Sequence, residues 1–144
     1  MPVVVTGADG TLGAPVLAAL LAALGGGEPP ELRATVRDRA AVAPLVAAGV
    51  RTAVSDLVDP ARFGAVLEGA HTVVHLDDPL GTWELLLDAA EDTGVRRVVT
   101  VLDPADLAPA APGYDLVVLR HPAGHPADDT LIAAVLAADR RRLP

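Results

Sequence analysis

Short runs rich in valine alternate with longer stretches rich in alanine and leucine along most of this 144-residue chain. Runs with the β-branched composition of buried strands stand at residues 3–5, 32–36, 50–54, 71–76, 97–102 and 115–119. Stretches with helical composition stand at residues 12–24, 40–48, 60–67, 83–91 and 128–140. Strands that alternate with helices form a parallel sheet covered on both faces. We therefore expect an α/β fold of three layers, a doubly wound parallel sheet of about six strands, as a single domain over residues 1–144.

Several helix ends carry their own signals. Three glycines at residues 25–27 predict the end of the first helix, and Pro60 suits the first turn of the third. Asp128 or Asp129 suits the N-cap of the last helix. Between the fifth and sixth predicted strands, residues 103–113 hold three prolines and show no helical period, so a loop is expected there.

Charge and composition exclude several classes of function. The formal net charge is −8, which argues against nucleic acid, because proteins that track phosphates carry a basic face. There is no cysteine, so neither a disulfide framework nor thiol chemistry is expected. The apolar stretch at residues 12–24 is too short to cross a bilayer and does not resemble a signal peptide. We expect a cytoplasmic protein with no nucleic-acid partner and no membrane partner.

Three glycines follow the first predicted strand at the spacing G-x-x-G-x-x-G. Gly7 allows a tight exit from the strand, Gly10 leaves room for a pyrophosphate, and Gly13 permits close packing of the helix on the sheet. The N–H groups of Thr11 and Leu12 stand at the positive end of the helix dipole, which favours phosphate. Between a strand and a helix, this spacing predicts a dinucleotide site. A purely structural glycine turn is the alternative.

This turn, with further segments, resembles the short-chain dehydrogenase/reductase superfamily in its atypical or extended NAD(P)-binding branch, which includes NmrA-like proteins and NAD-dependent epimerases. Similar segments stand at residues 36–38, 55–57, 73–76, 86–99 and 115–120. The resemblance implies a truncated Rossmann fold that binds a dinucleotide. It also implies that Asp56 and Leu57 contact the adenine, although Asp56 could instead cap a turn. Leu76 and Asp77 would lie beside the cofactor, with Asp77 or Asp78 facing its ribose.

Arg37, at the end of the second predicted strand, bears on the choice of cofactor. An acidic residue there would hold the ribose 2′-hydroxyl of NAD(H), whereas an arginine can pair with the 2′-phosphate of NADP(H). Arg39 is close by, but Asp38 could turn inward and favour NAD(H), and an arginine at this place can also be simply solvated. We expect NADP(H) in preference to NAD(H).

The catalytic pair of the superfamily, Tyr-x-x-x-Lys, is missing, because all eleven residues counted as lysine or arginine are arginine. The sole tyrosine, Tyr114, is expected at the edge of the sixth strand. Catalytic residues are therefore left unassigned. His75 could act as a general base if it faced the cleft. His121 and His125 have no evident third ligand, so no metal is expected.

Three functions remain open. The first is a sensor or regulatory protein whose binding of NADP(H) controls a protein partner. The second is a small NADPH-dependent oxidoreductase, epimerase or isomerase that uses other residues, or residues borrowed across a homodimer. The third is a scaffold that has lost nucleotide binding and keeps its glycines for packing.

Overall fold

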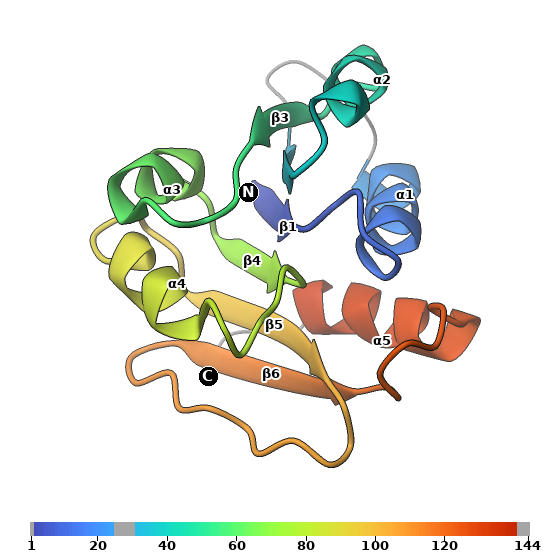
Figure 1. Ribbon diagram of the computed structural model, residues 1–144, viewed down its shortest axis with the longest axis vertical. Helices are drawn as coiled ribbons and strands as arrows, with labels where there is room; N and C mark the ends of the chain where they lie inside the picture. Colours follow the sequence, from blue (N-terminus) through green and yellow to red (C-terminus); the bar gives the residue numbers. More distant parts are fainter. Residues whose placement is uncertain (1, 25–30, 141–144) are drawn as a thin grey trace.

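A computed structural model describes residues 2–24 and 31–140 of the chain (Figure 1). Within these residues, the strands form one six-stranded sheet of order β3-β2-β1-β4-β5-β6, and every neighbouring pair is parallel. The strands are β1 (Val3–Thr6), β2 (Leu32–Val36), β3 (Arg51–Val54), β4 (Thr72–His75), β5 (Arg97–Leu102) and β6 (Asp115–Arg120). The expected doubly wound parallel sheet is confirmed.

Helices cover both faces of the sheet and complete three layers. One face carries α1 (Gly13–Leu24), α2 (Val42–Ala47) and α5 (Asp129–Arg140), which pack on a largely aliphatic core. The other carries α3 (Pro60–Leu67) and α4 (Trp83–Ala90), whose core adds Phe63 and Trp83. Figure 1 shows α1 and α5 on one side of the sheet and α3 and α4 on the other.

Burial follows the position of each strand in the sheet. All residues of β1, β4 and β5 are buried, since these inner strands are covered on both faces. The edge strands β3 and β6 are half-buried along most of their length. Because the inner strands are buried on both faces, valines follow one another in β1, β4 and β5 rather than alternating with exposed polar residues.

Helix ends match most of the sequence signals. Asp59 accepts hydrogen bonds from the first turn of α3, which has proline at its start, and Asp128 accepts one from the backbone N–H of Leu131 in α5. The predicted helix at 40–48 is split into a 3₁₀ turn, η1 (Arg39–Ala41), and the short α2. Asp38 caps that turn through the N–H of Ala40. The glycines at 25–27 lie outside the described residues.

Two further expectations concern the loop between the fifth and sixth strands and the apolar character of the helices. No helix or strand forms in the described segment 103–113, so the predicted loop is confirmed. Among the described residues, no helix combines the length and the apolar character needed to cross a membrane.

The order of the strands places a topological switch point between β1 and β4, where doubly wound folds have their binding crevice. The chain winds from β1 to β2 and β3 in one direction, then returns to β4 on the other side of β1 and continues to β5 and β6. Ligands of doubly wound folds bind outside the carboxyl ends of the strands at such a switch point. The candidate site is therefore sought where the chain leaves β1 and β4.

Candidate functional site

The glycine turn leaves β1 at this switch point, and two of its glycines are required by the local geometry. Gly7 has a φ of +64°, in the left-handed region that favours glycine. A Cβ on Gly13 would overlap the carbonyl oxygen of Gly7, so the start of α1 can approach the end of β1 only without a side chain. A Cβ on Gly10 would lie 3.2 Å from the same oxygen. The turn is thus folded tightly on itself.

The turn offers backbone donors at the start of α1. Gly10 donates its N–H to the carbonyl of Gly7 at 2.9 Å, and Ala14 donates to Gly10 at 3.0 Å. Among the described residues, no acceptor takes the N–H of Thr11 or Leu12. Two neighbouring donors at the positive end of a helix dipole suit an anion such as phosphate.

Asp9 links this turn to the end of β2 by hydrogen bonds. Its carboxylate accepts hydrogen bonds from the backbone N–H groups of Arg37, at 3.0 and 3.2 Å, and of Asp38, at 2.9 Å. The backbone N–H of Ala8 adds a bond to the carbonyl of Thr35 at 2.9 Å. Sequence analysis missed this role of Asp9, for which the only signal was an acidic residue inside the glycine turn.

Arg37 forms a two-pronged ion pair with Asp77. The Arg37 Nε atom lies 3.0 and 3.1 Å from the two Asp77 carboxylate oxygens, and a terminal guanidinium nitrogen lies 2.9 Å from one of them. The hydrogen bond to Asp77 raises the pKa of Arg37 above its usual value. The Arg37 side chain is 52% exposed, so its guanidinium remains accessible to a ligand.

Asp77 lies beside the glycine turn because backbone bonds hold it there. The N–H groups of Leu76 and Asp77 donate to the hydroxyl oxygen of Thr6, at 2.9 and 3.2 Å. A Cβ on Gly7 would come within 3.1 Å of the Cα and Cβ atoms of Asp77. The structure therefore brings together Gly7, Arg37, Leu76 and Asp77 of the expected site.

His75 is buried beneath this site and does not face the crevice. Its Nδ1 lies 2.8 Å from the Thr6 hydroxyl and its Nε2 lies 2.7 Å from the Thr82 hydroxyl, which in turn donates to the Asp77 carbonyl at 2.9 Å. Because the Thr6 oxygen already accepts two N–H groups, its own proton goes to Nδ1, and Nε2 carries the ring proton. Burial lowers the pKa of His75 to about 3, so the ring is neutral near pH 7.

Asp56 and Leu57 take different positions. Asp56 is exposed, and its carboxylate accepts a hydrogen bond from the N–H of Val58 at 3.3 Å, as in a turn cap. Leu57 has a φ of +60° and is 1% exposed, in the core with Phe63. Asp56 faces solvent near Arg37, whose charge it attracts, whereas Leu57 is packed in the core.

A cavity of about 220 Å³ adjoins the far end of the turn, over the carboxyl ends of β5 and β6. Asp103 shapes it by accepting the N–H groups of Ala105 and Ala123, and these bonds lower the pKa of its carboxyl. His121 is buried and bonded to the carbonyl of Pro126 at 2.9 Å. The cavity is lined by Leu12, Asp78, Pro79, Leu80, Val101, Leu102, Asp103, Asp106, His121, Pro122, Ala123, Gly124 and His125.

Two other features of the chain lie apart from the turn. Tyr114 precedes β6 and so stands at the amino edge of the parallel sheet, opposite the crevice; burial raises its pKa. The rings of His121 and His125 are 6.5 Å apart, and the described residues hold no group of three or more acidic, histidine or cysteine side chains that could bind a metal ion.

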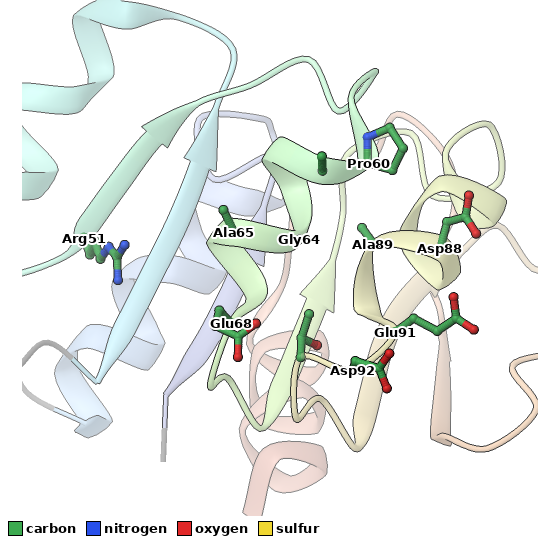
Figure 2. Close-up of a pocket in the computed structure, with 11 residues that line it drawn as sticks. Arg51, Pro60, Gly64, Ala65, Glu68, Asp88, Ala89, Glu91 and Asp92 are labelled. Carbon is green, nitrogen blue, oxygen red and sulfur yellow. The ribbon is translucent and has the colours of Figure 1, made fainter.

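A larger open cavity, of about 860 Å³, lies between α3 and α4 (Figure 2). Figure 2 shows Asp88, Glu91 and Asp92 along one wall and Glu68 on the other, with Arg51 further away. An acidic wall repels phosphate, and none of the glycine-turn residues lines this cavity. The dinucleotide site is therefore sought at the turn.

Solved structures share this architecture. Triphenylmethane reductase from Citrobacter sp., complexed with NADP(H), is 24% identical and covers 70% of this chain at a TM-score of 0.58. An Escherichia coli NADPH-dependent quinone oxidoreductase in complex with NADPH is 24% identical over 70% of the chain, with a TM-score of 0.60. A putative epimerase from Bacteroides thetaiotaomicron is 20% identical over 95% of the chain, with a TM-score of 0.59. No protein-family model and no curated protein matches the sequence.

The likeness to these proteins concerns the fold. This chain covers 37% of the triphenylmethane reductase, 36% of the quinone oxidoreductase and 60% of the putative epimerase, so it spans less than two thirds of each. The expected resemblance to NAD(P)-binding reductases and epimerases is confirmed at this level, and the Rossmann-type fold with it.

Proposed function

We propose that this protein binds NADP(H) at the glycine turn and that it works without the tyrosine and lysine pair of the superfamily it resembles. The proposal rests on one observation above all: the N–H groups of Thr11 and Leu12, at the start of α1 and at the switch point of the sheet, have no acceptor among the described residues. The structures with the same fold include reductases complexed with NADP(H). The turn would hold the pyrophosphate through these donors.

Arg37 supports NADP(H) rather than NAD(H). It follows β2, the strand whose end meets the adenosine ribose in this fold, and its guanidinium is half-exposed. Pairing with a 2′-phosphate would be charge-assisted on both sides. Asp38 does not compete as a ribose ligand in this arrangement, since its carboxylate caps η1 through the N–H of Ala40.

Isothermal titration with NADPH, NADP, NADH and NAD tests the proposal. We expect NADPH to bind more tightly than NADH, and Arg37→Ala to weaken NADPH by roughly tenfold or more, as for the loss of a charge-assisted pair. Arg39→Ala is the matched control, because Arg39 is exposed on the same segment and its side chain has no contact to Asp77. Absence of binding by all four nucleotides would contradict the proposal and favour a scaffold.

A sensor or regulatory role is our first candidate for the NADP(H)-bound protein, because the chain has no lysine and Tyr114 precedes β6, at the edge of the sheet opposite the crevice. A small NADPH-dependent reductase or epimerase is the second candidate, favoured by the cavity of about 220 Å³ that begins at Leu12 of the turn. Loss of reduced-nicotinamide absorbance with quinones or triphenylmethane dyes as substrates would decide for the reductase. No turnover of these substrates by a protein that binds NADPH would count against the reductase and favour the sensor.

A further inference from the structure

The ion pair of Arg37 and Asp77 crosses the strand end from which the glycine turn departs. Arg37 directly follows β2, Asp77 stands two residues after the end of β4, and β1 lies between these strands in the sheet. A side chain that joins the ends of β2 and β4 must therefore pass over the end of β1. Gly7 is the first residue beyond that end.

The pair also lies close to the turn. Asp77 is so near Gly7 that an added Cβ would sit at 3.1 Å from its Cα, and only 9% of the Asp77 side chain is exposed. A dinucleotide approaches the turn from this same carboxyl edge of the sheet. The guanidinium and carboxylate therefore occupy the route by which the nucleotide reaches the turn.

We propose that the Arg37–Asp77 ion pair closes the glycine turn of the unliganded protein, and that a phosphate of the ligand opens it by replacing the Asp77 carboxylate on Arg37. This inference rests on the proposed function. Carboxylate and phosphate both present two oxygens to the guanidinium fork, so the exchange keeps Arg37 paired. A ligand without a phosphate for Arg37 must break the pair and receives no replacement. Breaking the pair therefore lowers the affinity for both nucleotides, and only a ligand with a phosphate for Arg37 recovers part of that loss.

Other acidic groups near Arg37 act only at longer range. Asp56 and Asp78 attract its charge, and the contacts of the described residues include no hydrogen bond from Arg37 to either carboxylate. Asp78 is adjacent in sequence to Asp77 and carries the same charge, which makes Asp78→Asn a matched control for Asp77→Asn.

The test titrates NADPH and NADH into the wild-type protein and both variants, after circular dichroism has shown that each is folded. We expect Asp77→Asn to tighten both ligands on the order of three- to tenfold, the range of a half-exposed, two-pronged ion pair. Asp78→Asn removes an equal charge at longer range from Arg37, so it should raise the affinity for either nucleotide by less than about twofold. In a protein that already carries Arg37→Ala the ion pair is absent. There, Asp77→Asn should tighten binding by less than about twofold.

A second readout uses the wild-type protein. The Nε–H proton of Arg37, assigned by its loss in Arg37→Lys, should be protected from exchange in the unliganded protein and should shift when NADPH is added.

Equal or weaker binding by Asp77→Asn, or an unprotected Nε–H, would overturn the inference while wild-type NADPH binding left the proposed function standing. Failure of the wild-type protein to bind either nucleotide would overturn both.

Discussion

The Nδ1 atom of His75 lies 2.8 Å from the hydroxyl oxygen of Thr6, and this bond joins the ends of two neighbouring inner strands. The ring has no exposed surface, and its other nitrogen is bonded to Thr82. His75 therefore has a structural role beneath the crevice. It positions the loop that carries Asp77, whose backbone carbonyl is bonded to the same Thr82 hydroxyl.

Stability should fall in mild acid because of His75. Its pKa is lowered from 6.5 to about 3 in the folded protein, so the unfolded chain takes up the proton first as the pH falls. The free energy of unfolding should decrease by roughly 1.4 kcal/mol per pH unit between these two values and be unaffected above the upper one. Urea unfolding across this range, compared with His75→Gln, measures the effect. Equal slopes for the two proteins would contradict it.

Gly13→Ala should destabilise the protein by about 1–3 kcal/mol or more, because the new methyl group overlaps the carbonyl of Gly7 and the start of α1 must move. Gly10→Ala places its methyl at 3.2 Å from the same oxygen and should have a smaller effect. Thermal unfolding of the two variants gives the comparison. A larger loss for Gly10→Ala would show that the turn has a different geometry.

Arg97→Met should be strongly destabilising. Arg97 is fully buried, with its Nε 2.8 Å from a carboxylate oxygen of Asp115 and a terminal nitrogen 2.9 Å from the carbonyl of Asp139. Removing one partner of a buried pair leaves a desolvated charge and costs about 3–5 kcal/mol. Arg96→Met, at the exposed neighbouring position, should change the midpoint of chemical denaturation little. Similar losses for both would contradict the role of the pair.

Asp9→Ala should lower the free energy of unfolding by about 0.5–2 kcal/mol, since two backbone N–H groups at the end of β2 lose their acceptor. Asp9→Asn keeps one acceptor oxygen and should retain part of that free energy. Urea unfolding of both variants gives the values. No change in Asp9→Ala would mean that water replaces the carboxylate at no cost.

The strands were predictable because buried parallel strands leave a direct trace in the sequence. Each of the six predicted runs differs from its strand by no more than one residue at either end, and the segment without periodicity at 103–113 is a loop. The split of the second helix was not predictable from composition, because it depends on the cap that Asp38 makes with Ala40. Local hydrogen bonding there overrode the helical pattern.

The contacts within the candidate site were harder to predict than its location. The glycine spacing located the turn, but the bonds from Asp9 to β2 and from Arg37 to Asp77 join residues 28 to 40 positions apart. These bonds depend on which strands are neighbours in the sheet and on the rotamers that the side chains adopt there, and neither can be read from the local sequence. Asp78 has a φ of +44°, so the chain turns directly after Asp77, which the sequence does not reveal.

The loop between β5 and β6 has a consequence for how this fold can change. The loop is held at its start by bonds from Arg120 to the carbonyls of Asp103 and Asp106, and further on by the bond from Trp83 to the carbonyl of Ala110 at 2.8 Å, but between these anchors Leu107 is 90% exposed. Since β5 and β6 are already aligned by their own ladder, the length of this connection is not fixed by the core. It is a permissive insertion point, where a grafted helix or epitope could be accommodated next to the crevice without rearranging the sheet.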